Sequence, residues 1–219
     1  MRATSLALLA GALAVLAAAP AAADPAVGAQ TFSDNGCTDC HYTEGPARET
    51  SIADQLAKTG PELWYAGSKF QAEWLAAWLQ DPQPIRPRAY NASNEPNPNN
   101  HPALGADDAA TVNEFLMTLV SDAVEAGVIK PKKGAKGRNI FTKKMPCTGC
   151  HQFPTKKKFT GGFSGPSLVG AGSRLNPDWI FAYLMNPDVF KPFKAMPTFS
   201  GLLSEKKIKA VAAYVAHFE

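Results

Sequence analysis

Reactive and metal-binding side chains are scarce in this sequence. It has four cysteines and four histidines in 219 residues, and every cysteine belongs to one of two five-residue motifs, so none is left over as an unusual metal ligand. After the first 23 residues no segment is apolar enough to span a bilayer, which takes about 20 such residues. No convincing alternating strand pattern is found, so the chain lacks the βαβ context of thioredoxin-like proteins.

The first 23 residues are expected to be a signal peptide. Arg2 is the only charge ahead of an apolar run from Leu6 to Ala19, and the small residues 21–23 suit a signal peptidase. This pattern predicts export to the periplasm, with a mature chain that starts near Asp24. An uncleaved membrane anchor is the alternative, but the apolar run is short for a span.

Charge is divided unevenly along the chain. Residues 24–125 carry fifteen acidic and five basic side chains, a net charge of −10, whereas residues 126–219 carry four acidic and sixteen basic ones, a net charge of +12. This split favours two domains that dock on different partners, or two halves that attract one another. We expect protein partners and no nucleic acid.

An internal repeat defines the expected architecture. The segment Cys37 to His41 recurs as Cys147 to His151, and Gly60 to Pro82 aligns with Gly165 to Pro187 at a constant offset. These are two copies of one small domain. We therefore divide the chain into a signal peptide (1–23), an acidic N-terminal domain (24–125), a linker (126–136) and a basic C-terminal domain (137–219).

Both copies are predicted to be helical. Ser204 is a suitable N-cap for a last helix over Glu205 to Phe218, whose apolar residues recur at helical spacing. The first copy has the same stripe in residues 112–119. A middle helix from about Phe70 to Gln80 should end at Pro82, because proline cannot continue a helix and restricts the residue before it.

The repeated motif is Cys-x-x-Cys-His, which is the attachment signature of c-type haem. Its two cysteines can form thioethers to the two vinyl groups of one porphyrin, and the histidine that follows reaches the iron from the same side. The alternatives are disulfides, thioredoxin-like redox motifs and a Cys₂His zinc site. The predicted export and the helical repeats favour haem over these alternatives. The sequence thus predicts two covalent haems, bound through Cys37, Cys40, His41, Cys147, Cys150 and His151.

Both halves resemble class I cytochrome c domains, and the tandem resembles the two-domain, dihaem cytochromes of the cytochrome c4 type. The resemblance implies an all-α fold in which each domain is a small helical bundle around one covalent haem. In this family a glycine and an aromatic residue on the first helix pack against an aromatic residue on the last. Here the first domain would pair Gly28 and Phe32 with Phe115. The second would pair Gly137 and Phe141 with Tyr214.

The resemblance also implies further residues around each haem. In the family, the proline carbonyl of a Gly-Pro-x-Leu segment accepts a hydrogen bond from the ring of the attachment histidine. Pro61 and Pro166 fit this role, which orients a metal ligand and tunes the metal. Trp74, Trp179 and Arg174 are expected to bind the cofactors as well.

The sixth iron ligand of the second domain is expected to be Met196. Met196 and Pro197 precede the last helix and resemble the family's Met-Pro ligand loop, and His/Met ligation raises the haem potential. Met185 lies on the middle helix, where packing is the better explanation, and Met145 is too close to Cys147 to reach the opposite face of the haem.

The first domain departs from the family, because it has no methionine between its haem motif and its last helix. His101 and Pro102 stand where Met196 and Pro197 stand in the other copy, so we expect His101 to be the sixth ligand. The loop before it is ten residues longer than its counterpart and rich in Asn and Pro, so its register is open. Tyr90, a lysine or an open site are the alternatives.

Electron transfer is the expected function, and the protein is not expected to be an enzyme. Electrons would pass from a lower-potential bis-histidine haem in the first domain to a higher-potential His/Met haem in the second, and then to an acidic redox partner. A basic partner would suit the first domain. Lysines near the second haem would steer docking, unless they form only a solvated basic face. They are Lys143, Lys144, Lys156, Lys157, Lys158, Lys191 and Lys194.

Two other functions remain open. A haem enzyme of the peroxidase or sulfur-compound oxidase type would need an open iron, which only the first haem could offer. A haem-bearing subunit of a dehydrogenase or reductase complex, peripheral to a membrane, would share every motif described above.

Overall fold

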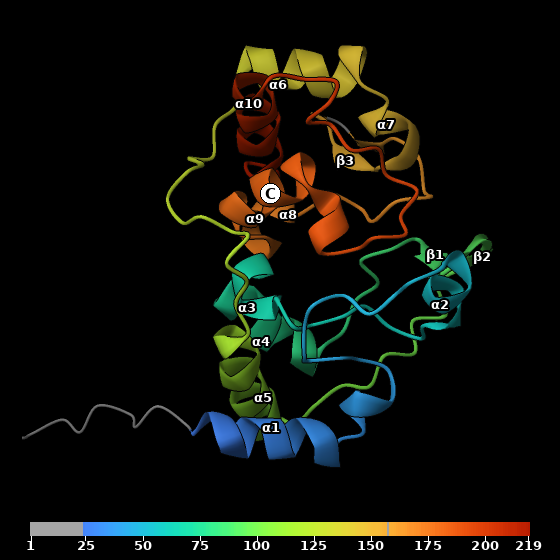
Figure 1. Cartoon of the computed structure of the whole chain (residues 1–219), viewed down its shortest axis with the longest axis vertical. Coiled ribbons are helices and arrows are strands. Elements are labelled where there is room, and N and C mark those ends of the chain that lie inside the picture. Colours follow the sequence, from blue (N-terminus) through green and yellow to red (C-terminus); the bar gives the residue numbers. More distant parts are fainter. Residues whose placement is uncertain (1–23, 157) are drawn as a thin grey trace, which may run out of the picture.

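The computed structural model describes residues 24–219 apart from Lys157, so the predicted signal peptide lies outside the described residues. The helices form two groups that are stacked along the long axis of the molecule (Figure 1). The first group contains α1 (Pro25–Asp34), η1 (Cys37–Asp39), α2 (Ile52–Ala57), α3 (Ala66–Lys69), α4 (Ala72–Gln80) and α5 (Ala106–Thr118). The second contains α6 (Ala135–Asn139), η2 (Ile140–Lys144), α7 (Cys147–Cys150), α8 (Ala171–Arg174), α9 (Pro177–Met185), η3 (Pro187–Val189) and α10 (Glu205–Val215).

The fold is rich in helix, as expected, but the described residues also form four short strands that the sequence did not predict. β1 (Arg88–Ala89) pairs with β2 (Ala92–Pro96) in the long loop before His101, and β3 (Phe153–Pro154) pairs with β4 (Phe159–Thr160) after the second haem motif. Three of the strands have two residues, and the five residues of β2 do not alternate between apolar and polar, which explains why both hairpins were missed.

The helix ends follow from local sequence. The side chain of Asp24 accepts a hydrogen bond from the Ala26 amide and caps α1, with Pro25 at the first helical position. Asn176 caps α9 in the same way, ahead of Pro177. The helix α4 ends at Gln80, so the predicted stop before Pro82 is confirmed.

In each half the first helix crosses the last one closely. A Cβ atom added to Gly28 of α1 would lie 2.5 Å from the Cβ of Phe115 on α5, so only glycine fits at this crossing. The rings of Phe32 and Phe115 meet edge to face at 5.8 Å. In the second half, Phe141 and Tyr214 also have their ring centroids 5.8 Å apart. The aromatic contacts that were expected from the sequence are confirmed.

Two hydrophobic cores result from this packing. The first gathers around Phe32, Leu75, Val112 and Leu116. The second gathers around Phe141, Trp179, Ile208, Val211 and Phe218. The second core also includes Tyr65, which precedes α3 and comes from the first half of the chain, so the two halves share buried surface.

The segment between the halves, predicted to be a linker, is held firmly to the second core. Ile129 is buried, and the amides of Gly127 and Ile129 each donate a hydrogen bond of 2.7 Å to the carboxylate of Asp178. The amide of Lys132 binds the carbonyl of Ala213 at 2.8 Å. These bonds fix where the second half begins relative to α9 and α10.

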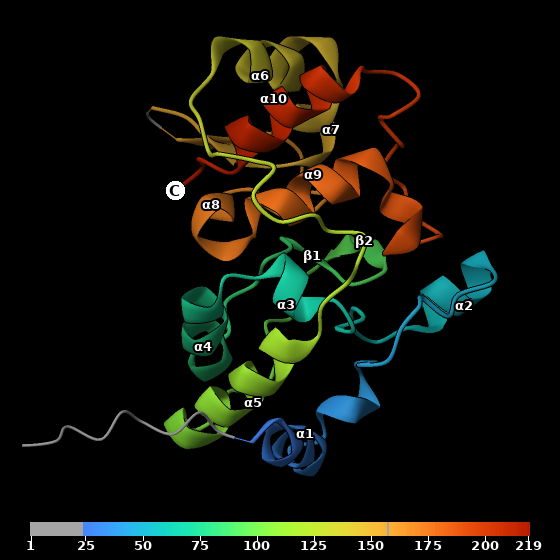
Figure 2. The same ribbon diagram turned by 60° about the vertical axis from the view of Figure 1, so that its left-hand side comes forward.

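The interface between the halves is built from residues that occupy matching positions in the sequence repeat. Phe70 and Leu175 form an antiparallel bridge. The Gln71 amide donates to the Arg174 carbonyl at 3.0 Å, and the Asn176 amide donates to the Lys69 carbonyl at 2.8 Å. Figure 2 shows α3 below α8 and α9 at this interface.

Within residues 24–219, Lys157 excepted, no helix has both the length and the hydropathy needed to cross a bilayer.

Candidate functional site

Both motif histidines are oriented by a proline carbonyl. The ring Nδ1–H of His41 donates to the Pro61 carbonyl at 2.7 Å, and that of His151 donates to the Pro166 carbonyl at 2.8 Å. A ring that donates from Nδ1 keeps the lone pair of Nε2 for a metal. The pKa of each ring is lowered, mainly by burial, which favours the neutral form that a metal needs.

A glycine lies against each of these rings. A Cβ atom added to Gly60 would lie 2.7 Å from Cε1 of His41, and one added to Gly165 would lie 2.7 Å from Cε1 of His151. Any side chain at either position would push the ring away from its carbonyl partner. The glycine of each Gly-Pro-x-Leu segment is therefore needed for the position of its histidine.

The cysteine pairs sit on single helical turns that end at the histidines. The His41 amide binds the Cys37 carbonyl at 3.0 Å, and the His151 amide binds the Cys147 carbonyl at 2.9 Å. All four thiols are free. Cys37 and Cys147 are half-buried, whereas Cys40 and Cys150 are exposed. This arrangement suits two thioethers and one axial ligand on the same side of a porphyrin.

The alternatives to haem fit less well. Burial raises the pKa of Cys147 to about 11 and also raises that of Cys37. Across the described part of the chain, no three side chains of the His, Cys, Asp and Glu types are grouped as a metal site would require. The thiols are not paired as disulfides either.

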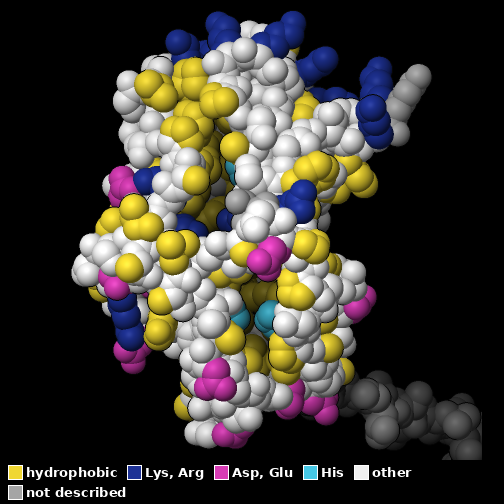
Figure 3. Space-filling model, turned by 90° about the vertical axis from the view of Figure 1, so that its right-hand side faces the viewer, with side chains coloured by type: hydrophobic (Ala, Val, Ile, Leu, Met, Phe, Trp, Pro, Cys, Tyr) yellow, Lys and Arg dark blue, Asp and Glu magenta, His cyan; other side chains and the backbone are white. Residues whose placement is uncertain are grey.

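His101 lies opposite His41. Their ring centroids are 6.1 Å apart, and the planes of the rings differ by 40°. Two imidazoles that bind one metal from opposite sides, with metal–nitrogen bonds of about 2 Å, would have centroids roughly 6 Å apart. Nδ1 of His101 is 2.9 Å from the Pro102 carbonyl, which leaves its Nε2 free, and Trp78 packs against the exposed ring at 4.7 Å. In Figure 3 two histidine side chains face each other across a hollow with hydrophobic walls.

Met196 lies in a bend between η3 and α10, is half-buried and packs against the second core. An apolar pocket in the same half is lined by Cys147, Leu184, Phe199 and Ile208 among others, and Met196 is not one of its lining residues. Met145 also lines that pocket, while Met185 ends α9 and packs against the same core.

The two tryptophans expected at the haems, Trp74 and Trp179, each meet a cation from the other half of the chain. The Lys69 ammonium lies 5.1 Å from the ring centroid of Trp179, and the Arg174 guanidinium lies 5.8 Å from that of Trp74. Trp179 is buried, and its indole N–H has no hydrogen-bond partner in the described part of the chain. Such an orphaned donor is costly unless a further group accepts from it, and a haem carboxylate would suit.

Around this crossing, cations outnumber anions. Burial lowers the pKa of Lys69 to about 7, and the nearby charges of Arg174, Arg86 and Lys191 lower it further. Arg174 donates a 2.6 Å hydrogen bond to the Ser167 carbonyl. None of these four side chains takes part in an ion pair within the described residues. The propionate groups of haem are anions of the right kind for this region.

Sequence reasoning identified Arg174 but missed Lys69, Arg86 and Lys191. The signal for Lys69 was present, because it aligns with Arg174 at the constant offset of the repeat. Arg86 lies in the long loop of the first half, which has no counterpart to align with, and Lys191 had been assigned to the docking lysines.

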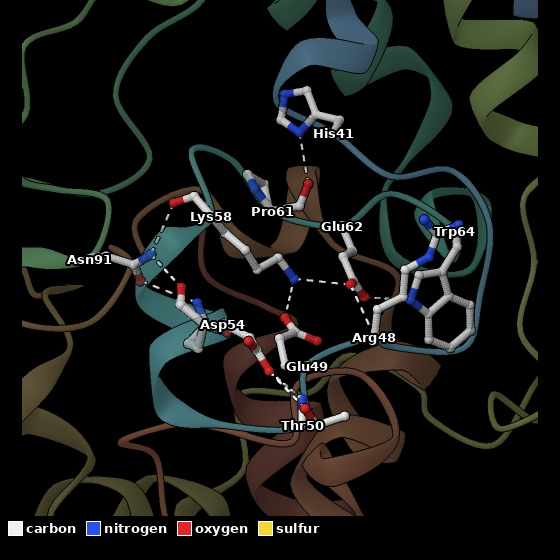
Figure 4. A network of polar contacts seen from close by, with 11 residues as sticks. His41, Arg48, Glu49, Thr50, Asp54, Lys58, Pro61, Glu62, Trp64 and Asn91 are labelled. Atoms are coloured by element: carbon white, nitrogen blue, oxygen red, sulfur yellow. Dashed lines mark hydrogen bonds and ion pairs between the residues drawn. The ribbon is translucent and has the colours of Figure 1, made fainter.

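A buried charge cluster lies behind the first histidine (Figure 4). The Lys58 ammonium contacts the carboxylates of both Glu49 and Glu62, and it is 3.0 Å from the latter. Glu62 follows Pro61 in the chain and also accepts a 2.8 Å hydrogen bond from the indole of Trp64. The side chains of Lys58, Glu49 and Glu62 are only 10%, 3% and 2% exposed. Two carboxylates and one ammonium therefore leave an excess negative charge near the His41 site.

The predicted docking lysines separate into two groups. Lys143 and Lys144 of η2 are exposed, and so are Lys156 and Lys158 beside the β3–β4 hairpin. Lys194 instead pairs with Asp188, and Lys191 packs over the ring of Tyr90. Lys157 lies outside the described residues. Among the described members of this set, the four exposed lysines remain available for the docking that the sequence suggested.

Comparison with known proteins gave one family match. Residues 132–215 match the family model described as cytochrome c oxidase, cbb3-type, subunit III. No curated protein and no solved structure matched the chain. The match covers the second motif, its histidine and the Met196 loop. It supports a c-type cytochrome domain in this part of the chain, with covalently bound haem and a role in haem-based electron transfer.

Proposed function

We propose that the protein is a periplasmic, dihaem electron-transfer protein built from two class I cytochrome c domains. The observation that carries this proposal is the duplicated histidine site. In both halves a Cys-x-x-Cys-His turn, a proline carbonyl and a glycine surround the histidine in the same way. A family match to the second half supports haem there, and the same geometry supports haem in the first.

When bound, each haem would supply a one-electron couple at its iron. His41 and His101 would hold the first iron, and His151 and Met196 the second. A thioether favours Fe(II) more than a second imidazole does, so the second site should have the higher potential. Electrons would then move from the first half to the second.

The exposed lysines of the second half would form the surface on which the electron acceptor docks. Lys143, Lys144, Lys156 and Lys158 surround the segment that holds Cys150 and His151. Their positive charge would speed encounter with an acidic redox partner rather than strengthen the final complex. A basic partner would suit the acidic first half.

The number of haems tests the proposal. Purified from a host that matures c-type cytochromes, the protein should show two haem additions in its intact mass. Replacing Cys37 and Cys40 with serine should leave one haem, and the matched replacement of Cys147 and Cys150 should leave the other. A wild-type chain with a single haem would contradict the proposal.

The ligand role of His101 has its own test. His101→Ala should open the first iron, produce a high-spin fraction and allow fast carbon monoxide binding at one haem only. If the wild-type protein already binds carbon monoxide rapidly, the first site is open, and the peroxidase or oxidase function becomes the better explanation.

A second candidate is a fixed subunit of an oxidase or other membrane complex, and the description of the matching family favours it. A fixed subunit should pass electrons quickly only within its complex. Rapid oxidation of the purified holoprotein by small soluble acidic redox proteins would instead favour a free carrier.

A further inference from the structure

The long loop before His101 reaches across to the second half of the chain. The carbonyl of Ile85 accepts a 2.8 Å hydrogen bond from the Ser167 amide. The guanidinium of Arg86 donates to the Ser164 carbonyl at 3.4 Å. These two bonds lie on either side of Gly165 and Pro166, the pair that positions the ring of His151. A loop of the first half therefore holds the segment that orients the histidine of the second.

Arg86 is fixed in this position from its own side as well. Its carbonyl accepts a 3.0 Å hydrogen bond from the side chain of Asn97, and the Asn97 amide binds the carbonyl of Pro87 at 3.1 Å. Burial lowers the pKa of Arg86, and no ion pair compensates its charge among the residues described. The result is a partly buried cation without a counter-charge.

This charge lies close to the histidine of the second half. The Arg86 guanidinium binds the carbonyl of Ser164, the next residue is Gly165, and Gly165 lies against the ring of His151. A fixed cation near an iron disfavours its more positive, oxidised form and so raises the reduction potential. The effect is strong only where water does not screen it, as in this partly buried interface.

We propose that Arg86 is a positioning and tuning residue which the first half supplies to the second haem, and that its charge raises the potential of that haem. The inference rests on the proposed binding of haem in both halves. It also gives the long loop a second purpose. The same segment that presents His101 to the first site would set the driving force of electron transfer toward the second.

The test is a redox titration of the holoprotein that resolves both haems. Arg86→Gln removes the charge, and we expect the potential of the second haem to fall by about the equivalent of a tenfold change in equilibrium constant, or about 59 mV for one electron. The potential of the first haem should change less. Arg86→Lys keeps the charge, so the potential of the second haem should stay close to the wild-type value. Arg88→Gln, which removes a cation two residues along the same loop, is the matched control and should leave the second haem unchanged.

A second variant protects the test against misfolding. Ser164 is exposed, so Ser164→Asp should be tolerated, and it would add a negative charge at the residue whose carbonyl binds Arg86. We expect it to lower the potential of the second haem, whereas Ser164→Asn should not.

If Arg86→Gln and Arg88→Gln give the second haem the same potential, the tuning role is wrong. The same holds if Arg86→Lys lowers that potential as far as Arg86→Gln does. In both cases the dihaem proposal stands. If Ser164→Asp and Ser164→Asn agree, the same conclusion follows. A chain that carries only one haem would overturn both proposals.

Discussion

Loss of Lys58 should destabilise the first half of the protein strongly. Its ammonium is the one hydrogen-bond partner of Glu49 within the described residues, and one oxygen of that carboxylate already has none. Lys58→Met would leave the charge of Glu49 buried without a partner. Glu62 would keep its bonds to the Trp64 indole and the Arg48 amide.

The size of the effect follows from the burial of this cluster. Removing one partner of a buried ion pair costs about 3–5 kcal/mol, because an uncompensated charge remains. Lys209→Met is the matched control, since Lys209 pairs with Glu205 on the surface, where the two side chains are 42% and 58% exposed. Exposed pairs contribute about 0.2–1 kcal/mol. Urea unfolding of the holoprotein, followed by circular dichroism, should separate the two variants clearly.

The pH dependence gives an independent check of the mechanism. Burial lowers the pKa of Lys58, but its hydrogen bonds to Glu49 and Glu62 outweigh burial and raise it overall. A lysine whose pKa is higher in the folded state contributes stability that is fully present below its unfolded pKa, about 10.4. That contribution is lost as the pH rises through the higher folded value. The difference in the free energy of unfolding between wild type and Lys58→Met should therefore be constant from pH 7 to 10 and become smaller at higher pH. If Lys58→Met and Lys209→Met lower the free energy of unfolding by the same amount, this reasoning is refuted.

Three further variants test separate parts of the site. Met196→Ala should remove the weak charge-transfer band at the red end of the oxidised spectrum and lower one haem potential, and survival of the band would mean that this ligand is wrongly assigned. Gly165→Ala should crowd the ring of His151 and shift the potential of the second haem. An unshifted potential would contradict the close contact between Gly165 and this ring. Replacing Lys156 and Lys158 with glutamine should slow electron transfer to an acidic partner and weaken its salt dependence, whereas unchanged rates would leave these lysines as a solvated surface.

Much of the fold followed from the sequence because its determinants are local or repeated. Pro82 was expected to end α4, and the helix does end at Gln80. Ser204 does precede α10, but its side chain makes no capping hydrogen bond, and the helix ends at Val215 rather than at Phe218. The close helix crossings were expected from the family resemblance, and the structure contains them. The contact between each histidine and its proline carbonyl came from a family resemblance, and the structure contains both bonds. Three strands of two residues, and the five residues of β2, carried no alternating pattern, so both hairpins were missed.

The parts that the sequence did not reveal depend on which residues meet at the interface between the halves. The contacts of Lys69 with Trp179 and of Arg174 with Trp74 join positions a hundred or more residues apart, and no local sequence pattern predicts them. Arg86 looked like an ordinary loop cation until the structure placed it beside Ser164. The Lys58 cluster escaped notice for the same reason, since charges in a sequence are usually solvated.

The most direct test of the account is a potentiometric titration of the oxidised holoprotein followed by EPR. The account predicts two low-spin signals, one from a His/Met iron and one from a bis-histidine iron. The His/Met signal should disappear first as the potential is lowered, and the bis-histidine signal second. A single low-spin signal, a high-spin signal from the first site, or loss of the bis-histidine signal first would contradict it.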